Sequence, residues 1–302
     1  MKKWILWSAA VLVVAACGLY YFFSGANEFS VSGYLGCNTG GAFRRVSQQG
    51  SWGAWWPGEV NRDAGGRDIY RLDGYDYKVL VSAYPLVDIS IVHEGREIRS
   101  RMSFSSLGRY DSTAIYWQLV SPVKGTSGLR NDMENILSHL RGYLEKSENI
   151  YGMAIQESST KDTFLIATKS FFKGYPGTAD IYGMVGKLRA YAEKVRAFET
   201  GYPMLNVTRV DSEFQVMTAL PVDRELRGGG DILYRRLVPG KFLVGDVKGG
   251  VGSVDAGFET MRQYISDHGR TVMAIPFQSL ITDRSKAPDS TQWLTRLYYP
   301  VY

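Results

Sequence analysis

FLIATKSFF, residues Phe164–Phe172, is a short apolar run, and FLVGDV, residues Phe242–Val247, repeats its character 78 positions later. Each run has the length and the residue types of a buried β-strand. A glycine-containing loop, a helical segment and two further extended segments follow each of them. Residues 163–222 and 241–302 therefore read as two copies of one strand–helix–strand–strand unit.

The spacing inside the two copies supports a duplication. Tyr191 precedes Pro203 by 12 residues, as Tyr264 precedes Pro276. A period near 80 residues is too long, and two copies are too few, for a solenoid. We therefore expect an α+β domain with a pseudo-twofold axis. Chance similarity between two strand–helix–strand segments is the alternative.

Composition and charge describe a folded chain without a basic surface. Hydrophobic residues make up 45% of the 302 residues and charged residues 22%, and this length suffices for two domains. The net charge of +5 comes from scattered Lys and Arg, with no basic run longer than two residues. Nucleic-acid binding needs a clustered basic face. We therefore predict no nucleic-acid partner.

The N-terminus carries a long apolar segment. Trp4–Phe23 is twenty residues without a charge, preceded by Lys2 and Lys3. A helix of this length just spans the hydrocarbon layer of a membrane. Because the positive charges precede it, we expect residues 1–24 to form a single-pass transmembrane helix with a cytoplasmic N-terminus. The body of the protein is then expected to be extracytoplasmic, which in a bacterium means periplasmic.

A lipid anchor is the main alternative for this segment. Val14–Cys17 resembles a bacterial lipobox, with Cys17 as the lipidated residue. A cleaved signal peptide is disfavoured by the aromatic run that follows Cys17. Either anchor attaches the protein to the membrane. The other cysteine, Cys37, has no partner for a disulfide or a zinc site, so we expect a small buried residue and neither a metal nor a cofactor.

The region before residue 150 reads as a meander of strands closed by a helix. A short helix carries Phe43 and Val46, a polar loop fills 61–68, and the apolar stripe of 129–144 is typical of an amphipathic helix. The expected strands have β-branched or aromatic enrichment and are Glu28–Leu35, Tyr77–Ala83, Val87–His93, Glu97–Phe104 and Thr113–Val120.

These features resemble the helix-grip superfamily of polyketide cyclases and START lipid-transfer domains. The W-x-x-W-W-P segment at Trp52–Pro57 and the closing helix carry the resemblance, which implies a helix-grip domain over 28–149 with an apolar cavity. Trp52, Trp55 and Trp117 are the candidate cavity-lining residues. Tyr116 must point to the opposite face from Trp117. Alternatively, the tryptophans close one end of the sheet.

Residues 150–302 are similar to the gyrase-inhibitor-like effector-binding domain of AraC- and MerR-type regulators. The resemblance rests on the duplication, on the glycine loop before the second helix, and on LYYPV at 297–301. It implies a ligand cleft between the repeats with a buried carboxylate. At the expected position this chain has Gln278, an amide that keeps the hydrogen bond and loses the charge. We infer a neutral or weakly polar ligand, unless Gln278 faces solvent.

Two aromatic residues near the C-terminus are further candidate ligand contacts. Trp293 shares an alternating face with Thr295, and Tyr298 falls on the other face with Arg296. Both faces cannot line one pocket, and each aromatic could instead belong to the core. The second helix is expected to be shorter than the first and to start near Asp255, whose charge argues against a dinucleotide site at the preceding glycines.

Catalysis has little support in the sequence. His93, His139 and His268 belong to no metal-binding or nucleophile motif. We therefore predict a membrane-anchored binding protein of the bacterial envelope whose partner is a small hydrophobic or amphiphilic molecule. The alternatives are a hydrolase or cyclase that acts on a hydrophobic molecule in one cavity, and a scaffold with collapsed pockets.

Overall fold

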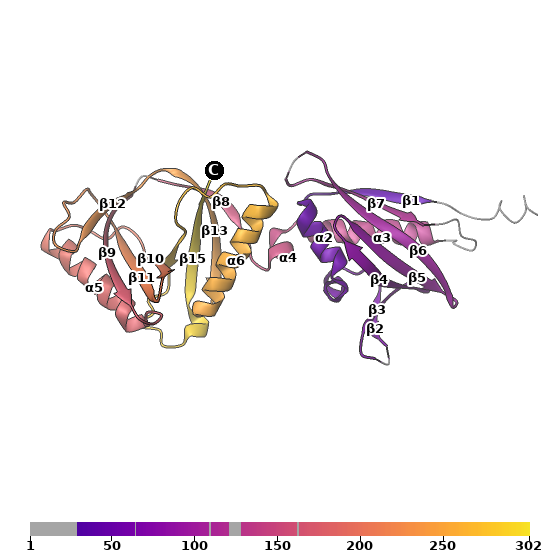
Figure 1. The fold of residues 1–302 in the computed structure, drawn as a ribbon, viewed down its shortest axis with the longest axis horizontal. Coiled ribbons are helices and arrows are strands. Elements are labelled where there is room, and N and C mark those ends of the chain that lie inside the picture. Colours follow the sequence, from indigo (N-terminus) through magenta and orange to yellow (C-terminus); the bar gives the residue numbers. More distant parts are fainter. Residues whose placement is uncertain (1–28, 64, 109, 121–127, 162) are drawn as a thin grey trace, which may run out of the picture. The chain divides into compact units, whose positions relative to one another are not determined.

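A computed structural model describes residues 29–302, except 64, 109, 121–127 and 162 (Figure 1). The chain divides into two compact units between Lys146 and Ser147. Both are α+β, as predicted. Within the described residues, no helix has the length and apolar character to cross a membrane. The membrane segment predicted at residues 4–23, and with it Cys17, lies outside the described residues.

The first unit is built on a seven-stranded antiparallel sheet with the order β1-β7-β6-β5-β4-β3-β2. Neighbouring strands mostly follow each other in the chain, so the sheet is a meander that β1 closes by pairing with β7. The strands are β1 (Ser30–Leu35), β2 (Glu59–Arg62), β3 (Asp68–Leu72), β4 (Tyr75–Ala83), β5 (Leu86–His93), β6 (Arg96–Ser106) and β7 (Thr113–Leu119).

Helices cover the apolar face of this sheet. The long helix α3 (Leu129–Leu144) contacts β1 and buries the predicted stripe of Leu129, Met133, Ile136, Leu140 and Leu144. The short helix α2 (Thr39–Ser47) forms despite its two glycines, because the Asn38 side chain accepts a hydrogen bond from the Gly41 N–H and caps it. A 3-10 turn, η1 (Gln49–Ala54), follows and carries Trp52. Cys37 is buried, as expected.

The polar loop predicted over 61–68 is shorter than expected. Its ends belong to β2 and β3, which pair as a hairpin from Glu59↔Arg71 to Arg62↔Asp68. The two strands have only four and five residues, so no apolar alternation indicated them. The turn between them is held by Asp63, whose carboxylate accepts hydrogen bonds from the Gly65 and Arg67 N–H groups.

The second unit is built on an eight-stranded antiparallel sheet with the order β12-β9-β11-β10-β14-β15-β13-β8. Each half contains the expected strand–helix–strand–strand order, β9-α5-β10-β11 and then β13-α6-β14-β15. From one edge inward, the added strand β12 is followed by β9, β11 and β10, the first, third and second strands of the first copy. From the other edge inward, the added strand β8 is followed by β13, β15 and β14, the first, third and second strands of the second copy. The strand order is therefore the same for the two copies, and β10 meets β14 at the centre.

The bounds of these elements are as follows. The strands are β8 (Gln156–Thr160), β9 (Thr163–Phe172), β10 (Met204–Val210), β11 (Glu213–Val222), β12 (Leu233–Leu237), β13 (Gly240–Lys248), β14 (Phe277–Leu280) and β15 (Leu294–Val301). The helices are α4 (Ser147–Tyr151), α5 (Thr178–Lys194), α6 (Val251–Asp267) and the 3-10 turn η2 (Ser290–Gln292). The strands β8 and β12 were not predicted, because they are exposed edge strands with little apolar patterning.

Both long helices lie on the same face of this sheet, each beside its own strands (Figure 1). Helix α5 packs on Leu205 and Leu280, and α6 packs on Leu297. Directly paired residues of neighbouring strands share a face, and Gln278 pairs with both Leu205 and Leu297. The other face carries no helix and is called the helix-free face below.

The expectation of a shorter second helix was wrong, because α5 and α6 both have 17 residues. Helix α6 begins directly after Gly250, so Gly252 lies in its first turn and Asp255 in its second. Because glycine usually marks a loop, the start of this helix was predicted too late in the chain. A glycine inside α6 is tolerated here because the helix lies very close to the sheet: a Cβ at Gly257 would stand 2.6 Å from Leu297 Cδ1.

Candidate ligand cleft beside helix α6

The centre of the second sheet is a narrow seam between its two halves. Strands β10 and β14 pair over only two residue pairs, Met204↔Ser279 and Leu205↔Gln278. Beyond Leu205, β10 continues without a partner on that side. The Asn206 side chain donates a hydrogen bond to the Pro276 carbonyl oxygen at 2.9 Å across this gap. The seam therefore leaves room on the helix-bearing face.

A cleft of about 730 Å³ opens there, and we call it the seam cleft. Its walls are the first half of α6, strand β10 and the loop before α5, and Gln278 lies at its floor. The apolar and aromatic lining includes Tyr175, Leu205, Val207, Val254, Phe258, Ile275, Pro276 and Tyr299. Phe258 and Tyr299 are in edge-to-face contact, with ring centroids 6.3 Å apart.

Charged side chains at the cleft balance one another. The lining holds two carboxylates, Asp255 and Glu259, and two guanidinium groups, Arg209 and Arg262. Arg262 pairs with Glu259 on the same helix, and this guanidinium holds the pKa of Glu259 below its usual range. Burial raises the pKa of Tyr175, and the charge of Asp255 adds to that effect.

Gln278 was the one predicted contact in β14, and the structure places it at this floor. Its side chain is 4% exposed, so the alternative that it faces solvent is wrong. Gln278 Oε1 accepts a hydrogen bond from Arg284 Nη2 at 3.3 Å. The same Nη2 donates to Thr295 Oγ1 at 2.7 Å.

Arg284 was not singled out from the sequence, because a lone arginine in a polar loop gives no signal. The loop after β14 turns its side chain inward, where it is 5% exposed and lies 4.8 Å from the ring centroid of Trp293. Its backbone N–H donates to the Tyr182 hydroxyl at 2.8 Å. Burial lowers the pKa of Arg284. Trp293, a predicted ligand contact, thus covers this guanidinium group.

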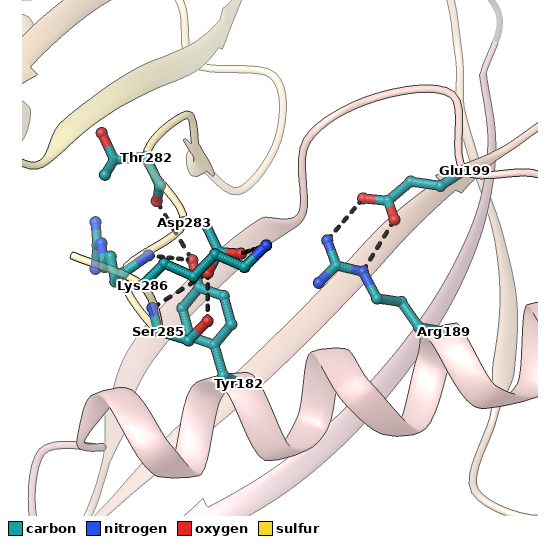
Figure 2. Close-up of polar contacts among 8 residues, drawn as sticks. Tyr182, Arg189, Glu199, Thr282, Asp283, Ser285 and Lys286 are labelled. Atoms are coloured by element: carbon teal, nitrogen blue, oxygen red, sulfur yellow. Dashed lines mark hydrogen bonds and ion pairs between the residues drawn. The ribbon is translucent and has the colours of Figure 1, made fainter.

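A second pocket, of about 520 Å³, is lined by Tyr182, Arg189, Glu199 and Asp283, among others. Figure 2 shows Tyr182 pointing from α5 towards the loop of Thr282–Lys286, and Arg189 pointing towards Glu199. Arg189 donates two hydrogen bonds to the Glu199 carboxylate, at 2.9 and 3.1 Å. The Asp283 carboxylate is occupied by Ser285 and Lys286. The charges of this pocket are therefore already satisfied.

Tyr298 lies away from the seam cleft, on the helix-free face. Its ring stacks on Phe277 at 4.8 Å, and Phe242 completes the group. A smaller pocket of about 360 Å³ on this face is lined by Phe277 together with Leu165, Ala167, Met204 and Leu237. The structure therefore does not bring Tyr298 together with Gln278 and Trp293.

The three tryptophans named in the first unit lie in its core. Trp117 is 1% exposed, whereas Tyr116 on the opposite face is 43% exposed, as the strand alternation predicted. Trp52 contacts both Trp55 and Trp56, with ring centroids 5.4 Å apart, and donates to the Val46 carbonyl oxygen at 2.8 Å.

These rings do not line the pocket of about 530 Å³ found in the same unit. That pocket is lined by residues of η1 and of the β2–β5 region, most of them polar, among them Gln49, Asp63, Arg67, Asp76 and Lys78. A ligand role for Trp52, Trp55 and Trp117 stays a prediction. Within the part of the chain that the structure describes, no cluster of three or more acidic, His or Cys side chains is arranged to hold a metal ion.

The second unit is thus an α+β domain with two halves of the same strand order and a cleft over their seam on the helix-bearing face. No protein-family model matches the chain, and no curated protein matches it.

Similar solved structures include the EcmrR C-terminal domain, which is 14% identical, with a TM-score of 0.44 over 50% of this chain and 98% of that one. SAV2435 bound to tetraphenylphosphonium is 19% identical, with a TM-score of 0.32 over 50% and 94%. A hydrolase from Listeria innocua is 12% identical, with a TM-score of 0.39 over 49% and 91%.

Proposed function

We propose that the second unit binds a small, mostly apolar molecule in the seam cleft. The cleft itself carries this proposal. Its volume of about 730 Å³ falls within the range of small-molecule sites, roughly 300 to 1,000 Å³. Aromatic and aliphatic side chains make up about half of its lining, and polar or charged side chains make up the rest. Among the polar groups, the amide of Gln278 is buried and can orient a ligand. Apolar walls with polar groups that fix the orientation are typical of ligand pockets.

The test is direct binding to the full-length protein in phosphatidylcholine nanodiscs, with empty nanodiscs subtracted. We expect at least one of three naphthyl compounds, 1-naphthoate, 1-naphthamide and 1-naphthylmethylammonium, to bind with one-to-one stoichiometry and to raise the melting temperature. Phe258→Ala should weaken that binding at least tenfold, because the ring forms one wall of the cleft. Phe171→Ala, which truncates an exposed ring outside the cleft, is the control.

Absence of binding by all three compounds would argue against a small-molecule site. Binding that Phe258→Ala leaves unchanged would place the ligand elsewhere. Either result would contradict the proposal that the seam cleft is a ligand site.

We also propose that the chain is held at a membrane through Trp4–Phe23, with its body outside the cytoplasm. The support comes from the twenty uncharged residues and the preceding lysines. Intact-mass measurement on protein extracted from membranes tests the anchor. We expect the segment to be retained, and a mass that begins at a lipid-modified Cys17 would establish the lipoprotein alternative instead.

The helix-grip family, the absence of a nucleic-acid partner and the absence of catalysis stay predictions. The first unit has the predicted antiparallel sheet with α3 against it. The aromatic core around Trp52 shows that rings fill the space beside η1. We therefore assign the proposed ligand to the second unit.

A further inference from the structure

Among the residues that the structure describes, no carboxylate pairs with the buried charge of the Arg284 side chain. This side chain is 5% exposed, and none of the ion pairs among the described residues includes it. The nearby ionisable groups that act on it are Tyr182 and Tyr175, which carry no charge at neutral pH. Burial of an unpaired charge is costly. A group that supplies the missing negative charge would therefore bind here with an unusual advantage.

The contacts that Arg284 does make are neutral and incomplete. Nη2 donates to Thr295 and, over a long 3.3 Å, to Gln278, while Nε is buried with no hydrogen-bond partner. The Trp293 ring faces the guanidinium at 4.8 Å, a cation–π contact. None of these partners has a negative charge. The planar donor set of an arginine matches a carboxylate or a phosphate group.

Gln278 lies between this guanidinium group and the seam cleft, and it accepts a hydrogen bond from Arg284. Tyr175 also lines the cleft, and the nearby charge of Arg284 acts to lower its pKa. The two carboxylates and two guanidinium groups of the lining cancel. Arg284 therefore leaves the site with one net positive charge, at its buried end rather than at its mouth.

We propose that the seam cleft selects organic anions, meaning an apolar or aromatic body that carries a carboxylate or a comparable oxyanion, and that Arg284 recognises the anionic group. The inference rests on the proposed function and adds the class of ligand. An oxyanion that reaches the floor replaces Gln278 Oε1 as the acceptor of the weakly held Arg284 donor. The Gln278 amide can then turn and donate its own N–H to the same anion.

The three naphthyl compounds share one ring system and differ in charge, so they test the selection. In the wild-type protein we expect 1-naphthoate to bind at least tenfold more tightly than 1-naphthamide, and the ammonium compound to bind most weakly. Equal affinity for the acid and the amide, or tightest binding of the ammonium compound, would overturn anion selection while the proposed function stands. Failure of all three compounds would instead remove the proposed function.

Variants of the same chain assign the selection to Arg284. In Arg284→Met we expect the tenfold preference for 1-naphthoate to disappear, while the affinity for 1-naphthamide changes less than threefold. Arg296→Met is the matched control, because Arg296 lies on the helix-free face and pairs with Asp246 at 2.7 Å. If Arg284→Met kept the preference, Arg284 would not be the recognition residue. The wild-type comparison of the three compounds holds even if the variant folds poorly.

The kind of oxyanion is resolved by a fourth compound, 1-naphthyl phosphate. Tighter binding of 1-naphthoate than of the phosphate would identify a carboxylate ligand, and the reverse order a phosphate ester. Both outcomes support anion selection by the cleft. Binding of the phosphate that survives in Arg284→Met would contradict the assignment.

Discussion

At the scale of single residues, the buried polar groups that lack a full set of partners are the informative ones. Arg284 is one of them, and Asp132 on α3 is another. The Asp132 side chain is 5% exposed, and its Oδ2 has no hydrogen-bond partner. Burial, the charge of Asp73 and a hydrogen bond with Asp73 raise the pKa of Asp132 to about 6. Neither group was identified from the sequence, because their neighbours come from distant elements.

We predict that Asp132 makes the protein less stable as the pH rises. Its folded-state pKa of about 6 lies above the unfolded value, roughly 3.9. Protonated Asp132 therefore contributes its full stabilisation of the folded state below about pH 4, and this contribution is lost as the pH rises through about 6. Asp132→Asn should raise the free energy of unfolding by about 1 kcal/mol at pH 8 relative to wild type and bring much less benefit at pH 4.5. Urea denaturation of the full chain at both pH values measures this.

The control is Asp88→Asn, which should have the opposite pH dependence. Hydrogen bonds from Arg101, at 2.6 and 3.0 Å, hold the pKa of Asp88 below its usual range. The bridge is partly exposed, so its loss costs little. A benefit of Asp132→Asn that did not depend on pH would show that the raised pKa is not the cause.

At the scale of elements, the two long helices of the second unit differ in how closely they approach the sheet. In α6, a Cβ at Gly257 would lie 2.6 Å from Leu297 Cδ1 and 2.7 Å from Val247 Cγ1. In α5, Gly183 and Gly186 have no neighbouring atom within 4 Å of such a Cβ. Gly257 of α6 therefore permits close contact with the sheet, whereas Gly183 and Gly186 of α5 only weaken the helix.

We predict opposite effects for the same substitution in these two helices. Gly257→Ala should lower the free energy of unfolding by about 1 to 3 kcal/mol, because the methyl group overpacks the sheet. Gly186→Ala should raise it by about 0.5 to 1 kcal/mol, because alanine is the better helix former. Denaturant unfolding of the two variants checks both signs. A stabilising Gly257→Ala would mean that α6 can move away from β15 at little cost.

At the scale of the whole molecule, the second unit is two well-paired halves joined by a short seam. Strand β11 pairs with β9 over nine residues, whereas β14 pairs with β10 over two. Local opening concentrates where hydrogen bonds and buried contacts are few. The proposed cleft lies over this weak point, so a ligand there would hold the halves together.

We predict that the amides of Phe277–Leu280 exchange hydrogen faster than those of Glu213–Val222 in the free protein. A ligand in the seam cleft should slow exchange in Phe277–Leu280 far more than in Glu213–Val222. The reason is that the ligand binds only the state in which β10 and β14 are paired. Hydrogen exchange followed by mass spectrometry, with and without saturating 1-naphthoate, measures both. Protection of Phe277–Leu280 equal to that of Glu213–Val222 without ligand would show that the seam is no weak point.

The sequence alone determined the main helices and most of the strands of both units, but not the strands β2, β3, β8 and β12. The apolar stripe of 129–144 and the repeated runs at 164–172 and 242–247 set α3, β9 and β13, because the periods of helices and strands are local properties of the chain. The face of the sheet on which a side chain lies then followed from alternation, as for the exposed Tyr116 and the buried Trp117.

Only the tertiary structure decided which polar groups lie in the interior and which distant side chains they meet. The guanidinium of Arg284 is brought together with Gln278, Thr295 and Trp293 by a loop and two strands, and Trp52 contacts Tyr70 of β3 with ring centroids 5.3 Å apart. Burial and charge balance depend on which distant segments come together. That information is carried by the three-dimensional arrangement, since no short window of the chain contains all the partners.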